Sequence, residues 1–148
     1  MAPGPAVVVD IDGVLADATG RQHHLRGPSP DWHAFFDAGA DDPAIDEMNA
    51  LLVLLDPSLA VCLVTARPAR VQPLTREWLE RHDVRWDLLV TRPPRTGGSA
   101  SAYKRDTTRD LRTYGFDLRL AFEDDPRNVE MFRGEGVHCL YVHSGYYL

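Results

Sequence analysis

Five short apolar runs, rich in β-branched residues, recur along the chain. They lack the strict alternation of apolar and polar residues that marks a strand with one face in water. The pattern therefore predicts strands that are buried on both faces. The expected strands are 6–11, 59–65, 86–91, 118–123 and 137–142.

Helical spacing of apolar residues marks the stretches between these runs. Asp42 and Asp125 are each followed by proline, so we expect both to cap a helix N-terminus. Gly115 is expected to end a helix in the left-handed conformation. The expected helices are 43–56, 74–83, 104–115 and 125–136.

Strands that alternate with helices predict a mainly parallel sheet covered on both faces. The fold class is therefore α/β, a three-layer α/β/α Rossmann-like arrangement with about five strands. We expect a flexible N-terminus at 1–5 and a single domain at 6–148. In such folds, ligands bind at the carboxyl ends of the strands.

Composition narrows the possible settings and partners. A formal charge of -6 argues against a protein that coats nucleic acid non-specifically, although a local basic site is compatible with it. Cys62 and Cys139 lie in apolar runs, which favours buried thiols and a reducing, cytoplasmic setting. No apolar run is long enough for a membrane helix, so we expect no membrane partner.

Charged side chains gather where the expected strands end. Asp10 and Asp12 end the first strand, and the fourth ends with Glu123, Asp124 and Asp125. Carboxylates that meet at one sheet edge repel one another, and a hard divalent cation relieves that repulsion. All-oxygen ligands favour Mg²⁺, so we expect Asp10, Asp12, Asp124 and Glu123 at a magnesium site.

These residues suit phosphoryl transfer. Asp10 is placed to attack phosphorus, and Asp12 to protonate the leaving oxygen and then activate water. Thr65 offers a hydroxyl donor to the phosphoryl oxygens, and Lys104 a point charge. Lys104 is the single lysine among sixteen basic residues.

Four stretches, "DIDGVLAD", "LVTARP", the lysine of "AYKRD" and "LAFEDDPRNVEMFR", resemble in order the four motifs of the haloacid dehalogenase superfamily. That superfamily consists largely of phosphatases that form an aspartyl-phosphate. The resemblance implies Asp10 as nucleophile, Asp12 as general acid/base, and Thr65 and Lys104 as further catalytic residues.

A narrower resemblance links the chain to the phosphatase domain of polynucleotide kinase/phosphatases, through "DIDGVLADATGR", "PLTREWLE" and "GVHCLYVHSG" as well. It implies that Asp124 and the main-chain carbonyl of Asp12 bind the metal. It also implies substrate contacts from Arg21, Arg67 and Ala66. The chain departs from that family at "TGGSASAYK", where an Arg-Asp pair is common before the lysine, and it contains no P-loop motif.

Spacing bears on the substrate. The stretches after the first two motifs hold little beyond short helices, which leaves room for a minimal cap or none. An open site suits the 3′-phosphate of a DNA or RNA end. The alternative is a site that another subunit closes. Arg21, Arg67, Arg70, Arg92 and Arg95 are expected to form a local basic rim.

Three functions remain open on the sequence. The first is a Mg²⁺-dependent 3′-phosphatase of nucleic-acid ends, acting in nucleic-acid repair. The second is a nucleotide or small-metabolite phosphatase, and the third is a non-catalytic phosphate-binding module. The possible protein partners are a second copy of the chain or a separate kinase.

Overall fold

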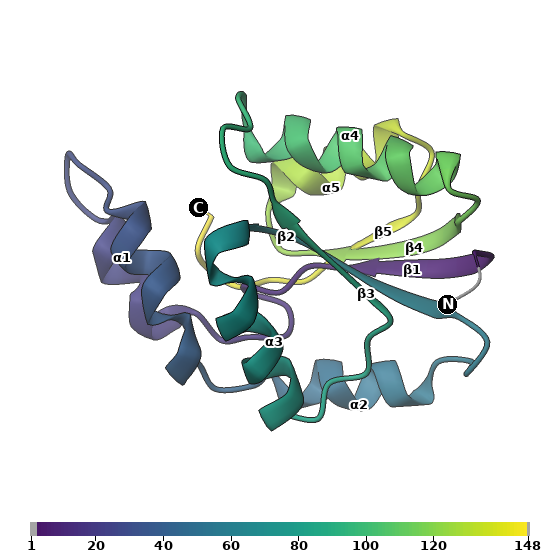
Figure 1. The fold of residues 1–148 in the computed structure, drawn as a ribbon, viewed down its shortest axis with the longest axis horizontal. Helices are drawn as coiled ribbons and strands as arrows, with labels where there is room; N and C mark the ends of the chain where they lie inside the picture. The colour runs from purple at the N-terminus through teal and green to yellow at the C-terminus, as the bar shows by residue number, and fades with distance from the viewer. Residues whose placement is uncertain (1–2, 148) are drawn as a thin grey trace.

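A parallel sheet forms the centre of the structure, a computed structural model that describes residues 3–147 (Figure 1). Within that range the strand order is β3-β2-β1-β4-β5, and every pair of neighbours is parallel. The expected α/β fold class is thereby confirmed. The strands are β1 (Pro5–Val9), β2 (Ala60–Pro68), β3 (Leu88–Arg92), β4 (Asp117–Glu123) and β5 (Cys139–Tyr141).

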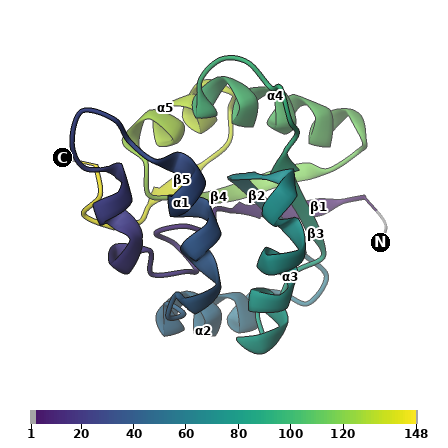
Figure 2. The same cartoon turned by 60° about the vertical axis from the view of Figure 1, so that its left-hand side comes forward.

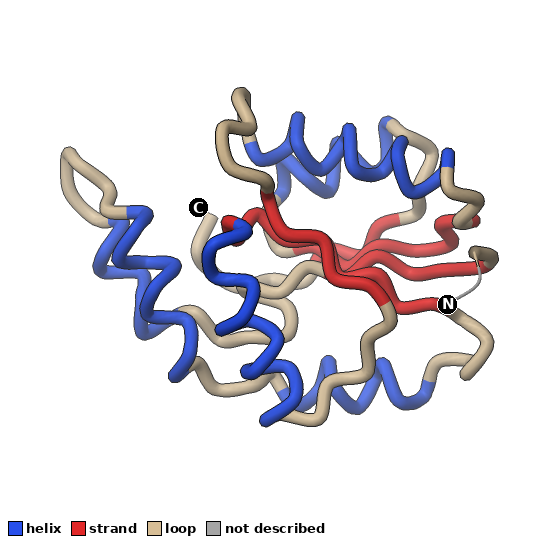
Figure 3. The backbone as a smooth tube through the Cα atoms, in the orientation of Figure 1, coloured by secondary structure: helices blue, strands red, loops and turns tan. Residues whose placement is uncertain are grey.

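Helices cover both faces of this sheet, as the tube in Figure 3 shows. The α-helices are α1 (Trp32–Asp37), α2 (Asp46–Leu54), α3 (Gln72–Arg81), α4 (Ala100–Thr113) and α5 (Pro126–Gly134). Short 3-10 turns form η1 (Thr19–Leu25), η2 (Ala38–Asp41) and η3 (Ala69–Val71).

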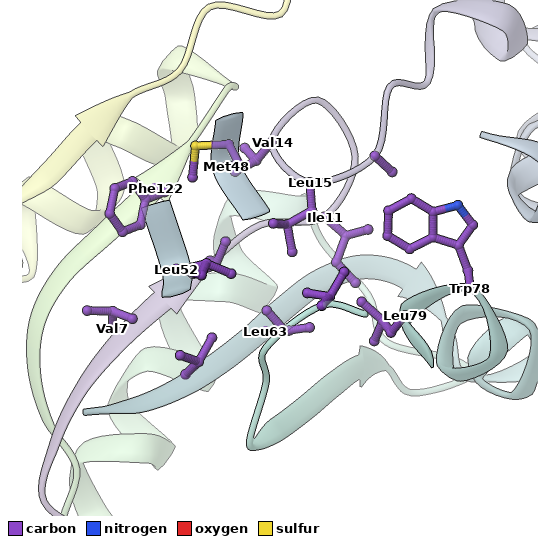
Figure 4. Packing of buried hydrophobic residues seen from close by; sticks show 14 residues of the cluster. Val7, Ile11, Val14, Leu15, Met48, Leu52, Leu63, Trp78, Leu79 and Phe122 are labelled. Atoms are coloured by element: carbon purple, nitrogen blue, oxygen red, sulfur yellow. The ribbon is translucent and has the colours of Figure 1, made fainter. Parts of the chain in front are cut away.

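The central strand β1 serves both halves of the core because its side chains alternate between the two faces. Val7 and Val9 pack with α2 and α3 in a cluster that includes the fully buried Trp78 (Figure 4). Ala6 and Val8 pack on the opposite face with α4 and α5. Hydrogen-bonded on both sides, β1 is a rigid support for whatever follows Val9.

The segment between β1 and β2 supplies the small amount of structure that extends beyond the sheet. Its last helix, α2, lies on the sheet, whereas η1, α1 and η2 project past the carboxyl ends of the strands (Figures 1 and 2). Among the described residues, no larger cap is inserted here.

Several local predictions can be compared directly with the structure. Asp125 caps α5 and accepts from the backbone N–H of Arg127, and Gly115 adopts φ +104° after α4, as expected. The prediction for Asp42 was wrong: α2 begins at Asp46, and Asp42 is buried against Arg21 instead. An ion pair with a buried guanidinium outweighs the capping preference at this position.

The structure also bears on the predictions for the N-terminal segment and the two cysteines. Of the segment expected to be flexible, residues 1 and 2 lie outside the described range, but Pro5 already pairs in β1. Both cysteines are buried free thiols. Across residues 3–147, no helix combines the length and the apolar character needed to cross a membrane.

Hydrogen bonds from Arg85 link the end of α2 to the start of β2. Its guanidinium donates to the backbone carbonyls of Leu52, Leu55, Asp56 and Leu59 at 2.7–3.0 Å. The last carbonyls of a helix have no hydrogen-bond donor within the helix, so the Arg85 side chain supplies the missing donors.

We expect Arg85→Met to lower the free energy of unfolding by about 2 kcal/mol, because several part-buried carbonyls lose a charged donor. Urea denaturation measures the change. Arg105→Met is the matched control, since Arg105 pairs only with its exposed neighbour Asp106, and it should change stability by less than about 0.5 kcal/mol. Equal effects of the two substitutions would contradict the assignment.

Candidate active site

Asp10 follows β1 directly and lies at the carboxyl edge of the sheet. Its backbone N–H donates to the carbonyl of Phe122 at 3.1 Å, which extends the β1–β4 ladder by one residue. The carboxylate accepts from the N–H of Ile11 at 2.8 Å and is only 8% exposed. Burial raises the pKa of Asp10 well above its usual value, and the charge of Glu123 adds to this effect.

Lys104 lies between two carboxylates. From α4, its ammonium group lies 3.1 Å from Asp10 and 2.6 Å from Glu123, and the side chain is buried. Burial alone would lower the pKa of Lys104, but these two carboxylates raise it above its ordinary value. The lysine is therefore charged at neutral pH and offsets part of the negative charge around Asp10.

Glu123 is fully engaged by protein donors. One oxygen accepts from Lys104 and from Asn128 at 3.2 Å, and the other accepts from the backbone N–H groups of Asp124 and Asp125. Burial would raise the pKa of Glu123, but Lys104 lowers it. Glu123 is thus an anionic partner that positions Lys104.

Asp124 presents an unpartnered oxygen to the same space. Its side chain is buried, and Oδ2 accepts no hydrogen bond from any described protein group. Burial raises the pKa of Asp124 to about 7, with the charge of Glu123 contributing. A buried carboxylate oxygen without a donor is costly unless a cation or a proton satisfies it.

Gly13 makes room for that oxygen. A β-carbon at this position would lie 2.1 Å from Oδ2 of Asp124, and the residue adopts φ +84°, a conformation that side chains disfavour. The glycine therefore allows the loop after β1 to approach Asp124 closely.

These carboxylates form a group that fits a divalent cation. Oxygens of Asp10, Glu123 and Asp124 lie within 4.8 Å of one another. Proximity alone admits Glu123 as a ligand, but its four donors leave it less free than the other two. The role of Glu123 at the metal therefore stays a prediction, whereas Asp10 and Asp124 have fewer protein donors and fit the role.

Asp12 faces a different set of partners. Arg67 donates to it from Nη2 at 2.7 Å and from Nε at 3.2 Å, and Arg21 donates at 2.7 Å. Burial would raise the pKa of Asp12, but the two arginines outweigh it and lower the pKa to about 2. The Asp12 side chain is therefore ionised at neutral pH, and it lies outside the cluster of Asp10, Glu123 and Asp124.

The two arginines are buried more deeply than a substrate-binding role predicts. Arg21 also bonds Asp42 and the carbonyl of Phe35, and Arg67 also bonds the hydroxyl of Thr75. They are 3% and 1% exposed. In the structure both arginines donate to Asp12, and their direct contact with substrate stays a prediction.

Most arginines of the expected basic rim are bonded to other protein groups. Arg70 pairs with Asp37 of α1, and Arg92 donates to the carbonyls of Thr96 and Gly98. Protein acceptors thus occupy four of the five arginines expected there.

The end of β2 supplies Thr65 and Ala66 next to this site. The Thr65 hydroxyl is buried and accepts from the backbone N–H of Arg67 at 3.1 Å. Ala66, next to it in β2, is only partly buried.

Sequence reasoning missed several contributors. Asp42 and Asn128 anchor the charged groups of the site, but in the sequence they resemble a helix cap and an ordinary polar helix residue. Tyr146 bonds the N–H of Ala18 at 2.8 Å across 128 positions, and no local pattern signals such a contact.

The parallel sheet, with Asp10, Lys104 and Asp124 brought together at its carboxyl edge, defines a haloacid dehalogenase-type phosphatase domain. A model of the phosphatase domain of polynucleotide kinase PNKP matches residues 4–147. The chain belongs to that family.

Solved structures agree on the fold. One match is a chain of the Pnkp1/Rnl/Hen1 RNA repair complex and another is a chain of a Pnkp1/Rnl/Hen1 complex; they are 20% and 21% identical, with TM-scores of 0.77 and 0.80. The two matches cover 95% and 97% of this chain. They cover only 43% and 46% of the matched chains, so this chain spans less than half of their length. A haloacid dehalogenase-like hydrolase from Streptococcus pneumoniae is 13% identical with a TM-score of 0.67, covering 97% of this chain and 88% of that one.

We expect Arg67→Met to lower the free energy of unfolding by about 3 kcal/mol near neutral pH, because a buried carboxylate loses one of its two cations. The folded-state pKa of Asp12, about 2, lies below that of an unfolded aspartate. Its stabilising contribution is therefore complete above about pH 4 and is lost as the pH falls towards 2. The difference from wild type, measured by urea denaturation, should shrink over that range.

Arg127→Met is the control for this experiment. Arg127 pairs with Asp125 at 2.9 Å but is 75% exposed, so its removal should have little effect at any pH. A wild-type-to-Arg67→Met difference that stays constant between pH 6 and pH 2.5 would contradict the role of Asp12.

Proposed function

We propose that this chain is a Mg²⁺-dependent phosphomonoesterase that removes the 3′-terminal phosphate from DNA or RNA ends through an aspartyl-phosphate. The observation that carries the proposal is the buried Asp10, which contacts Lys104 and lies beside Asp124 in a domain of this family. The presence of a structural relative in an RNA repair complex supports a nucleic-acid substrate.

In the first step, a carboxylate oxygen of Asp10 forms a bond to phosphorus while the bond from phosphorus to the 3′ oxygen breaks. Lys104, held charged by Glu123, offsets the negative charge of the phosphoryl oxygens. Thr65 and the backbone at Ala66 are the donors on the β2 side. Asp12 donates a proton to the leaving oxygen.

In the second step, water attacks phosphorus, inorganic phosphate leaves, and the Asp10 carboxylate is restored. Asp12 is ionised between its arginines, which suits it to accept the proton of that water. For the first step it must carry a proton, and a bound phosphate dianion favours this by raising the pKa of nearby carboxyls.

Asp10 and Asp124 would hold the magnesium ion, together with the main-chain carbonyl of Asp12 that the family resemblance implies. The unpartnered Oδ2 of Asp124 is the observation that supports a cation here. When bound, the ion supplies charge stabilisation to the phosphoryl oxygens.

The open carboxyl edge supports a polymer end as substrate. In the described residues, the segment between β1 and β2 adds η1, α1 and η2 beyond the strand ends and no large cap that would enclose a small metabolite (Figure 2). We propose a cytoplasmic setting on the basis of the two free buried thiols.

Mg²⁺ should stabilise the protein more at pH 8 than at pH 5.5. The folded-state pKa of Asp124, about 7, lies above the unfolded value, so the metal-free protein loses stability as the pH rises from about 4 to 7. A cation binds the deprotonated form and reverses this loss. Thermal unfolding with and without Mg²⁺ measures the effect, and Asp124→Asn should abolish it. An equal increase in melting temperature at both pH values would count against Asp124 as a ligand.

A substrate panel tests the function. We expect phosphate release in the presence of Mg²⁺ from 3′-phosphorylated DNA and RNA oligonucleotides, compared with nucleoside 3′- and 5′-monophosphates. Asp10→Asn should reduce turnover at least about 1000-fold while thermal unfolding stays cooperative. If mononucleotides react well and oligonucleotides do not, the polynucleotide assignment fails. Activity retained by Asp10→Asn would remove Asp10 as nucleophile.

A further inference from the structure

The segment after β5 forms part of the wall of the active site. A β-carbon on Gly13 would lie 3.1 Å from Cβ of Ser144, so this segment touches the loop after β1 beside Asp124. Tyr146 then bonds the backbone N–H of Ala18 at 2.8 Å and Asp17 at 3.3 Å. Both views place the segment after β5 at the carboxyl edge of the sheet (Figures 1 and 2).

Tyr147 is the side chain that this anchored segment presents. The ring is supported by Arg127, whose guanidinium carbon lies 5.7 Å from the ring centroid, and 41% of the residue is exposed. Arg127 is itself held by Asp125, the residue next to Asp124. The ring therefore lies against a side chain that is bonded to the neighbour of Asp124, while part of its surface is open to solvent.

The electrostatic surroundings of Tyr147 keep its phenol neutral. Burial raises the pKa of Tyr147, and the charges of Asp124 and Asp10 raise it further. A neutral aromatic surface beside a cluster of carboxylates attracts no phosphate, but it offers a flat face to an aromatic base. Arg21 and Arg67, the buried arginines of the site, already donate to protein acceptors.

We propose that Tyr147 is the specificity-determining contact for the base of the nucleotide whose phosphate is removed, and that its ring stacks on that base. The proposal rests on the nucleotide substrate class of the proposed function. Base stacking on an aromatic side chain contributes about 1–3 kcal/mol and tolerates all four bases. Such a contact recognises a nucleotide end without reading its sequence.

The test compares two substrates that differ only in the base. One is deoxyadenosine 3′-phosphate, and the other is 1,2-dideoxyribose 3-phosphate, which lacks a base. Tyr147→Leu should raise KM for the nucleotide about tenfold, because a stacking contact of about 1.4 kcal/mol is lost. The same variant should leave kcat and KM for the baseless substrate within about twofold, and Tyr147→Phe should resemble wild type on both.

Tyr114→Leu is the matched control. Tyr114 is 77% exposed next to the C-terminal end of α4 and has no contact with the site, so kinetics on both substrates should be unchanged. Melting temperatures of all the variants establish that each is folded. Because Tyr147→Phe retains the ring, it also separates stacking from the hydroxyl group.

The outcomes distinguish this proposal from the proposed function. If Tyr147→Leu impairs the kinetics on both substrates equally, the ring only shapes the wall of the site and does not contact the base. If it impairs the kinetics on neither substrate, the proposed contact is also overturned. Wild-type activity on the baseless substrate but no preference for the nucleotide would overturn the role of Tyr147 and leave the phosphatase chemistry in place. Wild-type inactivity on every 3′-phosphate would overturn the proposed function itself.

Discussion

Mutual repulsion among four carboxyl groups at one sheet edge is the constraint on which the site depends. Lys104 offsets the charges of Asp10 and Glu123, and a pair of arginines offsets the charge of Asp12. Among the four, only Asp124 has a fully buried oxygen with no protein donor in the described part of the chain. The protein's own cations thus offset only part of this negative charge, and the unpartnered oxygen of Asp124 marks a place where an added cation lowers the free energy.

This balance requires rigid positions, and the sheet provides them. Asp10 and Asp124 follow the ends of neighbouring strands, so backbone pairing of β1 with β4 sets the distance between them. A lysine suits the space between two carboxylates because its ammonium is compact, and Lys104 is 2% exposed there. The planar fork of an arginine suits Asp12 instead, where Arg67 donates from two nitrogens at once.

Much of this arrangement could be predicted from the sequence. Apolar runs located the strands, and the rule that ligands bind at carboxyl ends selected Asp10 and Asp124. The orientation of Arg21 and Arg67 could not be predicted, because it depends on Asp42, which is distant from Arg67 in the sequence and resembles a helix cap. Tyr147 was missed for the same reason: its neighbours belong to α5 and to the strand ends, and nothing in "SGYYL" indicates them.

The low pKa of Asp12 constrains the order of proton transfers in the proposed reaction. With a pKa of about 2, the resting side chain holds almost no proton at neutral pH, so it cannot serve as an acid until its surroundings change. A phosphate dianion brings negative charge to the same edge of the sheet and favours protonation of the nearest carboxyl groups. Once the phosphoryl group is on Asp10 and the proton has left with the alcohol, the arginines again favour the ionised form. Asp12 is then a base at the moment when water must be activated, so the same ion pairs that stabilise the fold set its role in each half of the reaction.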